Sequence, residues 1–203
     1  MTMNRHASFV TALGVARAKH IQAVIFDVDG VFTDNTELLG FEDGVIGKRR
    51  SYYDGQGVSL LRAIGIQVAL VTNERGAAAA HIQYQVEKWN NLPSSKRADN
   101  PSGWEHVALY FGRGGIRKVD AMNEWLAKIN LTSEVCAAMG DDLVDIAMLK
   151  EACLCAAPLQ ADPYIKDIAD FVSARPGGSG AVRDFANFIL EVRGLNPFDV
   201  AFE

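Results

Sequence analysis

The sequence predicts an α/β protein with a Rossmann-like, doubly wound parallel sheet. Short apolar runs alternate with segments of helical periodicity along most of the 203 residues, which is typical of parallel strands joined by crossover helices. Hydrophobic residues make up 49% of the chain and charged residues 22%, a composition ordinary for globular proteins. We therefore expect a single domain over residues 1–203, with its core at about 21–192 and no large cap domain.

Six apolar runs are predicted as strands, and six periodic segments as helices. The strands are Ala23–Phe26, Gln67–Val71, His106–Tyr110, Val135–Met139, Leu154–Ala156 and Asp170–Val172. The helices are Val58–Ile64, Gly76–Val86, Ile116–Ile129, Leu143–Ala152, Pro163–Ile168 and Ala181–Val192. Gly65 suits the end of the first helix because glycine adopts positive φ at little steric cost.

Two segments interrupt this alternation. Residues 32–51 are polar and carry the turn signals Asn35-Thr36 and Glu42-Asp43-Gly44, which predict a β-hairpin projecting from the end of the first strand. Residues 87–105 are rich in Asn, Ser, Pro and charge. Their composition favours a surface insertion over an element that covers a substrate.

Charge and cysteine content exclude several classes. A formal charge of -5 offers no broad cationic surface, so neither nucleic acid nor an anionic membrane is an expected partner. No run of 18 apolar residues and no signal-peptide core occur, which predicts a cytoplasmic location. Cys136, Cys153 and Cys155 lack zinc-site spacing, and we expect buried, reduced thiols.

The strongest chemical signal is a pair of carboxylates, Asp27 and Asp29, directly after the first predicted strand. In an extended segment, residues two apart point the same way, so both can face one reacting group. Gly30 lets the chain turn sharply just beyond them. Taken alone, the pattern fits an acidic turn or part of a calcium loop equally well.

A second acidic cluster follows the strand that ends at Met139, and contains Asp141, Asp142 and Asp145. Crowded carboxylates at one sheet edge are costly unless a cation compensates them. Oxygen ligands favour Mg²⁺ over zinc. Alternatively, Asp141 or Asp142 caps the helix beginning at Leu143.

Thr72 ends one strand and Lys118 begins a helix, between the two acidic clusters in the sequence. A hydroxyl and an ammonium at this sheet edge can hold phosphate oxygens. Alternatively, Thr72 is a helix N-cap, and Arg113 or Arg117 competes with Lys118 for a phosphate. The order of all four motifs along the chain favours the functional interpretation.

These four motifs resemble those of the haloacid dehalogenase superfamily, over residues 21–192. The hairpin, the Asp54-Gly55-Gln56-Gly57 turn before the first helix and the glycine-rich segment 177–183 are similar to the capless 3-deoxy-D-manno-octulosonate 8-phosphate phosphatase group. This resemblance implies a Mg²⁺-dependent homotetramer that acts on a sugar phosphate in lipopolysaccharide biosynthesis. In such tetramers a neighbouring subunit replaces the cap, so the hairpin is expected to meet a neighbour.

The resemblance also implies the residue roles. Asp27 is the nucleophile that forms an aspartyl-phosphate, and Asp29 is the general acid and base. Thr72 and Lys118 bind the phosphoryl oxygens. The Mg²⁺ ligands are Asp27, the backbone carbonyl of Asp29, and Asp141, with Asp142 or Asp145 acting through water or from outside the coordination shell.

Substrate contacts are predicted for one turn and for the residues around motif two. They are Ser51, Tyr52, Tyr53, Asp54, Gly55, Thr72, Asn73, Glu74 and Lys118. The group typically has Thr-Gly-Arg at motif two and another arginine about eight residues on, whereas here Glu74 stands at the first arginine position and Ile82 near the second. Glu74 is expected to repel a substrate carboxylate. The eight-carbon octulosonate 8-phosphate therefore stands only slightly ahead of a nine-carbon ulosonate 9-phosphate.

Three alternatives differ in class. The dehalogenase branch does not need a proton donor such as Asp29. A phosphoaspartate receiver domain has a contiguous acidic pair after its first strand, whereas the pair here is spaced. A non-catalytic assembly domain does not need intact motifs. On the hairpin, Lys48, Arg49 and Arg50 either face an anionic ligand or form a solvated basic turn.

Overall fold

The computed structural model of the chain describes residues 8–40 and 44–200. A seven-stranded sheet has the order β1-β9-β8-β7-β2-β5-β6, in which only β1 pairs antiparallel, with β9. The strands are β1 (Phe9–Val10), β2 (Ala23–Asp27), β5 (Gln67–Val71), β6 (Ala108–Tyr110), β7 (Cys136–Met139), β8 (Leu154–Ala157) and β9 (Phe171–Val172). The predicted α/β class is confirmed, and all six predicted strands are present.

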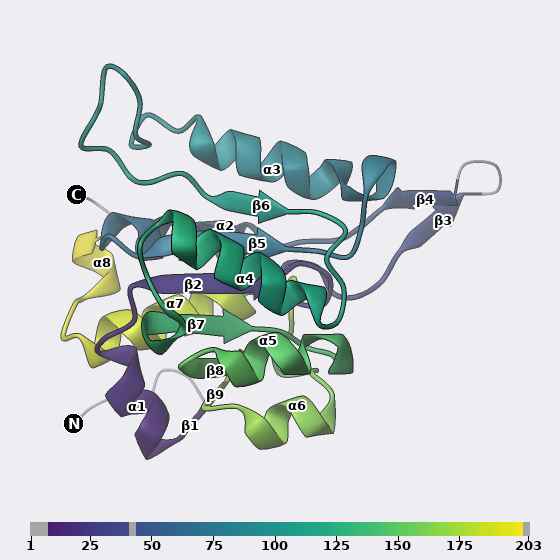
Figure 1. The fold of residues 1–203 in the computed structure, drawn as a ribbon. Helices are drawn as coiled ribbons and strands as arrows, with labels where there is room; N and C mark the ends of the chain where they lie inside the picture. Colours follow the sequence, from purple (N-terminus) through teal and green to yellow (C-terminus); the bar gives the residue numbers. More distant parts are fainter. Residues whose placement is uncertain (1–7, 41–43, 201–203) are drawn as a thin grey trace.

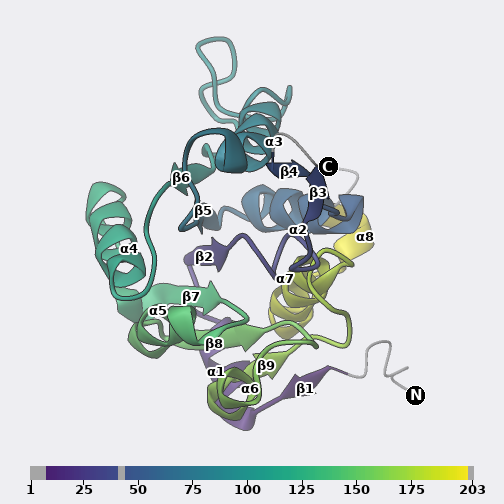
Figure 2. The same ribbon diagram turned by 90° about the vertical axis from the view of Figure 1, so that its right-hand side faces the viewer.

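Alternating side chains of the central strand β2 enter two separate hydrophobic cores. Val24 and Phe26 pack on one face, and Ala23 and Ile25 pack on the other. The first face is covered by α1 (Ala12–Ala18), α2 (Tyr52–Ala63), α3 (Ala80–Asn90) and α7 (Ala181–Val192), and the second by α4 (Arg117–Lys128), α5 (Ile146–Glu151) and α6 (Pro163–Ile168). Figure 2 shows α2 and α7 opposite α4 and α5 across the sheet. This is the doubly wound arrangement that continuous apolar strands require.

Helix α2 begins at Tyr52, six residues before the predicted start at Val58. The Ser51 side chain accepts a hydrogen bond from the Tyr53 amide and so caps the helix. Two glycines in the first turns hid this helix from a propensity argument. Gly57 is required by packing, because a Cβ there would lie 2.9 Å from the Arg183 backbone of α7. The predicted turn at Asp54-Gly55-Gln56-Gly57 is therefore wrong, and these residues are helical.

The chain ends and several helix starts also differ from the prediction. Strand β1, helix α1 and the short helix α8 (Pro197–Val200) have too few periodic residues to be recognised from the sequence. Short 3₁₀ turns at Gly76–Ala79 and Leu143–Asp145 precede α3 and α5. A further 3₁₀ turn at Ser133–Val135 precedes β7.

The predicted hairpin is present as β3 (Leu38–Gly40) paired antiparallel with β4 (Gly44–Gly47). Asn35 adopts a positive φ of 61° in the chain that leads to it. The predicted turn residues Glu42 and Asp43 lie outside the described residues. Figure 1 shows the hairpin projecting past the carboxyl ends of β2 and β5.

The segment 91–107 lies at the opposite edge of the sheet, beside the amino ends of the strands (Figure 1). Buried Arg62 of α2 holds it, donating to the carbonyls of Glu105 and Trp89 at 2.9 and 3.0 Å and to Ser95 Oγ at 2.9 Å. Burial lowers the pKa of Arg62 to about 10. This position supports the surface-insertion interpretation over one in which the segment covers a substrate.

Cys136 and Cys155 are buried, Cys153 is half-buried, and all three thiols are free. Burial raises the pKa of Cys136 and of Cys155 to about 12, which makes both thiols poor nucleophiles. Within residues 8–40 and 44–200, no helix has the length and apolar character needed to span a bilayer.

Candidate active site

Three predicted site residues meet at the carboxyl edge of the sheet because their strands are neighbours in the order β7-β2-β5. Asp27 is the last residue of β2, Thr72 directly follows β5, and Asp141 follows β7. All three side chains are buried. The carboxyl edge of an open parallel sheet is where ligands bind in this class of fold.

Lys118 brings the fourth motif into the same place. It lies in the first turn of α4 and is 1% exposed. Its Nζ lies 2.7 Å from Asp27 Oδ1 and 2.5 Å from Asp145 Oδ1. Burial alone would lower the pKa of Lys118, but the charges of Asp27 and Asp145 outweigh it and raise that pKa. The ammonium therefore stays charged beside the proposed nucleophile.

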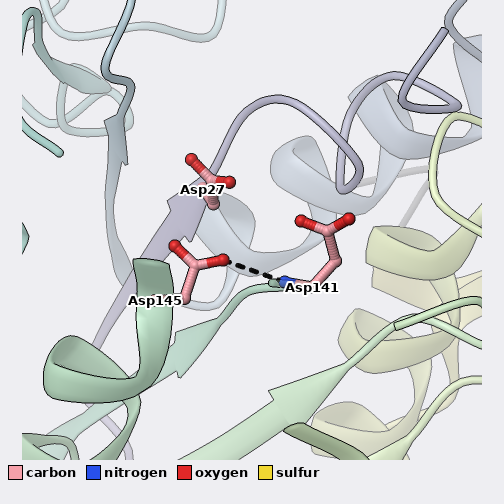
Figure 3. A group of neighbouring side chains, drawn as sticks. All are labelled: Asp27, Asp141 and Asp145. Carbon is pink, nitrogen blue, oxygen red and sulfur yellow. Dashed lines mark hydrogen bonds between the residues drawn. The ribbon is translucent and has the colours of Figure 1, made fainter. Parts of the chain in front are cut away.

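Asp145 is fully buried and positions its neighbours. Its Oδ2 accepts a hydrogen bond from the amide of Asp141 at 3.0 Å (Figure 3). The same oxygen accepts the amide of Asp142 at 3.2 Å. Its Oδ1 contacts the Lys118 ammonium, so both carboxylate oxygens of Asp145 have partners. The sequence signal for this role is the spacing of three residues from Asp142, which forms a capping box with it.

Asp27, Asp141 and Asp145 each offer an oxygen within 4.8 Å of the others. Burial, followed by the charges of Asp145 and Asp142, raises the pKa of Asp141 to about 7. Burial and the charge of Asp145 raise the pKa of Asp27 well above its usual range. Three carboxylates thus share one ammonium, and this excess of buried negative charge fits a divalent cation.

The carboxylates of Asp29 and Asp142 lie outside the group that could hold a metal ion. Asp142 is exposed, and its Oδ1 accepts the Leu143 amide at 2.7 Å, so its cap role is confirmed. The ligand that the resemblance implies at Asp29 is its backbone carbonyl; its carboxylate lies outside the group that could hold a metal and pairs with Lys48. Because the oxygens of Asp145 are already engaged, Asp27 and Asp141 are the two side chains left to hold a cation.

The turn at Gly30 packs directly against the carboxylate of Asp141. Gly30 has φ +84°, and a Cβ there would lie 1.9 Å from Asp141 Oδ2. Gln160 braces this turn: its Nε2 donates to the Gly30 carbonyl at 2.7 Å, and its Oε1 accepts the Gly177 amide at 2.8 Å. Gln160 was not predicted, because no local pattern marks a glutamine that acts across 130 residues.

Lys48 lies at the base of the hairpin and contacts two predicted site residues. Its Nζ is 2.6 Å from Asp29 Oδ1 and 2.6 Å from Glu74 Oε1. Glu74 is therefore paired with a cation, whereas the expected repulsion of a substrate carboxylate requires an unpaired Glu74. Arg49 is 74% exposed at its side chain, so the solvated alternative holds for Arg49 but not for Lys48.

Thr72 is 1% exposed, and its Oγ1 accepts the Glu74 amide at 3.0 Å. This bond fixes the start of the loop after β5, whereas no side-chain cap occurs at the 3₁₀ turn beginning at Gly76. Arg113 pairs with Glu124 at 3.3 Å, and Arg117 is exposed. Lys118 is thus the one of the three candidate cations that reaches Asp27.

Three of the remaining predicted substrate residues line a pocket, and the other three lie outside it. Ser51, Tyr52 and Tyr53 line a surface pocket of about 590 Å³ together with Arg49, Arg50, Gln56, Gly178 and Ser179. Asp54 is buried, and its oxygens accept the amides of Gly180 and Val182 at 3.1 and 3.0 Å, which caps α7. Gly55 lies against the indole of Trp89. Asn73 is exposed in the loop after β5.

A doubly wound sheet with these carboxylates, a threonine and a lysine at its carboxyl edge defines a class of hydrolase. The chain matches the haloacid dehalogenase-like hydrolase family over residues 13–183 and belongs to that family.

Several proteins similar to this chain are named as phosphatases of one sugar phosphate. The 3-deoxy-D-manno-octulosonate 8-phosphate phosphatase of Escherichia coli strain K12 is 30% identical over 185 residues, covering 91% of this chain and 87% of that protein. The solved structure of the Yersinia pestis enzyme of the same name is 28% identical, with TM-score 0.73, covering 94% of this chain and 95% of that one. A cobalt-bound form of the deoxy-D-mannose-octulosonate 8-phosphate phosphatase of Haemophilus influenzae is 26% identical, with TM-score 0.73 and coverage of 88% and 92%.

Proposed function

We propose that this chain is a Mg²⁺-dependent phosphatase of an ulosonate sugar phosphate, with 3-deoxy-D-manno-octulosonate 8-phosphate as its first candidate substrate. The observation that carries the proposal is the buried carboxylate of Asp27, held 2.7 Å from the Lys118 ammonium at the carboxyl edge of the sheet. The sugar phosphate named for the relatives supports the choice of substrate.

In the proposed reaction, a carboxylate oxygen of Asp27 attacks phosphorus. A new P–O bond forms, the ester P–O bond breaks, and Asp29 gives a proton to the departing sugar oxygen. Water then attacks the phosphorus of the aspartyl-phosphate while Asp29 takes its proton, which releases phosphate and restores Asp27. Splitting one displacement into two lowers the barrier of each, and general acid–base catalysis typically contributes about 10²- to 10⁴-fold.

Lys118 and Thr72 would bind the oxygens of the transferring phosphoryl group. Both lie beside Asp27 and are buried, so their interactions act with little screening by water. Asp145 keeps the Lys118 ammonium in place through its 2.5 Å contact.

Asp27 and Asp141 would hold Mg²⁺, with the backbone carbonyl of Asp29 as a third ligand. When bound, the cation would neutralise charge between the carboxylate and the phosphate dianion. The raised pKa values of Asp27 and Asp141 support this placement, because both carboxylates lack sufficient compensating charge. The cobalt-bound relative supports a divalent metal.

A nine-carbon ulosonate 9-phosphate is the second candidate substrate. Glu74 Oε2 is buried and has no hydrogen-bond partner among the described residues. Buried acceptors in native proteins are normally satisfied, and a sugar hydroxyl would satisfy this one. A longer polyol has more hydroxyls to offer.

The test is phosphate release with Mg²⁺ over eight- and nine-carbon ulosonate phosphates and common hexose phosphates. We expect catalytic turnover with an ulosonate phosphate and little with the hexose phosphates. Asp99→Asn is a matched control for carboxylate removal, because the Asp99 side chain is 73% exposed and lies on the segment 91–107 at the amino ends of the strands. A single stable phosphorylation per chain, or no turnover of any ulosonate phosphate, would contradict the proposal.

The proposal includes a cytoplasmic homotetramer in which the hairpin meets a neighbouring subunit. Leu38 and Leu39 on the hairpin are 65% and 69% exposed, which supports a contact at this surface. Closing an open site against water favours phosphoryl transfer. Light scattering at assay concentration is expected to give a tetramer, and an active monomer would contradict this part.

A further inference from the structure

A buried ammonium lies at the base of the hairpin, outside the set of residues that the phosphatase mechanism uses. The side chain of Lys48, directly after β4, is 5% exposed. Its Nζ lies 2.6 Å from Asp29 Oδ1, 2.6 Å from Glu74 Oε1 and 3.2 Å from Glu37 Oε1. Hydrogen bonds this short between two charged groups are stronger than those between neutral groups.

The three carboxylates come from three separate segments. Asp29 lies in the turn after β2, Glu74 in the loop after β5, and Glu37 just before β3. Lys48 therefore ties the hairpin to both loops that carry the proposed chemistry. Burial alone would lower the pKa of Lys48, but hydrogen bonds to Asp29 and Glu74 raise it above its usual range, so the tether stays charged.

The Asp29 carboxylate depends on this tether for its orientation. Among the described residues, no other side chain forms a hydrogen bond with it. Its side chain is 27% exposed, so packing alone leaves it room to turn. Glu74 is itself fixed by the bond from its amide to Thr72 Oγ1. Lys48 thus sits between a fixed loop and a carboxylate that must reach the leaving group.

We propose that Lys48 is a positioning residue that orients the Asp29 carboxylate toward the leaving-group oxygen, with Glu74 as its second anchor. This inference rests on the proposed phosphatase function. A displacement of about 1 Å from the productive geometry can cost about 10²-fold in rate. In a fold without a cap, the ionic tether supplies order on the leaving-group side of the site.

Two phosphate esters with different leaving groups distinguish a role of Lys48 in positioning Asp29 from a general structural role. A sugar alkoxide needs a proton to leave, whereas nitrophenolate leaves without one, so only the first ester depends on a well-placed Asp29. Lys48→Met is expected to lower kcat/KM for the ulosonate phosphate by about 10- to 100-fold and for p-nitrophenyl phosphate by less than about threefold. Equal losses on both esters, or no loss on either, would overturn the proposal.

A surface lysine far from the carboxyl edge of the sheet provides the matched control. Lys96 lies on the segment 91–107, pairs with Glu105 at 2.6 Å, and has a side chain that is 48% exposed. Lys96→Met is expected to leave both kcat/KM values unchanged. Lys48→Arg is expected to restore part of the activity lost on the sugar ester, since it returns a cation to the same carboxylates.

A double-mutant cycle tests whether Lys48 acts through Asp29. In an Asp29→Asn background, Lys48→Met is expected to cause little further loss on the sugar ester. Losses that multiply would overturn the proposal. If the wild type hydrolyses neither ester, the proposed function itself fails. The tether is then judged from the Lys48 ammonium signal in ¹H–¹⁵N spectra, which is expected to exchange slowly and to shift in Glu74→Gln, and whose absence would overturn it.

Discussion

Replacing Asp141 with asparagine is expected to make the metal-free protein more stable at neutral pH while removing its response to Mg²⁺. Asp141 is 5% exposed, and its pKa is raised to about 7 by burial and by the charges of Asp145 and Asp142. Asparagine has the same shape and no charge, so Asp141→Asn removes the cost of ionising this group.

The size and sign of this change in stability follow from the linkage between protonation and folding. An unfolded aspartate has a pKa of about 3.9, so between about pH 4 and pH 7 the folded chain keeps a proton that the unfolded chain has released. Stability of the metal-free wild type therefore falls as pH rises through this window. A difference of about three units at 1.36 kcal/mol each gives about 4 kcal/mol as an upper value above pH 7. Raised pKa values of Asp27 and of Asp54, the latter to about 6, act in the same direction.

Thermal unfolding in chelator at pH 5 and pH 7.5 measures this effect. At pH 7.5, Asp141→Asn is expected to raise Tm by about 5 to 10 °C, since 1 kcal/mol corresponds to about 2–4 °C in a chain of this size. At pH 5 the gain should be much smaller. Mg²⁺ should raise the Tm of the wild type at pH 7.5 and leave that of the variant unchanged. A variant less stable than wild type in chelator at pH 7.5, or an equal response to Mg²⁺, would refute the reasoning.

Three further predictions concern the support of the site. Arg62→Met should lower the free energy of unfolding in urea by about 2–4 kcal/mol, because two buried acceptors, the Trp89 carbonyl and Ser95 Oγ, and the part-buried Glu105 carbonyl lose their donor. Its kcat/KM should not change, and a selective loss of activity would show that the segment 91–107 acts on the site. Gly30→Ala should abolish turnover with the circular dichroism spectrum retained, since the new Cβ would collide with Asp141; a fully active variant would contradict that placement. Glu74→Arg should raise kcat/KM for the eight-carbon substrate relative to the nine-carbon one, and Glu74→Gln is its control because arginine also repels Lys48; an unchanged or lower ratio would mean that Glu74 does not select between them.

Much of the fold and the centre of the site could be predicted because their signals are local. The first four residues of β2, Ala23–Phe26, are buried and alternate between two cores, so this part of the strand is one apolar run in the sequence. Asp27, Thr72, Lys118 and Asp141 stand at the ends of such runs or at helix starts, and parallel topology then brings them to one edge.

The parts that were not predicted depend on contacts between distant segments. Gly57 lowers helix propensity at the start of α2, yet the close approach of α7 requires it. Lys48 and Gln160 reach their partners across 19 and 130 residues, and no spacing rule covers such pairs. The sequence does not distinguish Asp142 from Asp145, and only the three-dimensional structure shows that Asp145 is buried against Lys118.

Rapid acid quenching of the wild type with an ulosonate phosphate and Mg²⁺, followed by peptide mass spectrometry, tests the central claim most directly. The account predicts a phosphoryl group on the peptide that contains Asp27 during turnover, and its absence in Asp27→Asn. That variant should keep its fold and less than about one per cent of the wild-type kcat. Phosphate release without phosphorylation of Asp27, or an Asp27→Asn variant with more activity than this, would contradict the account.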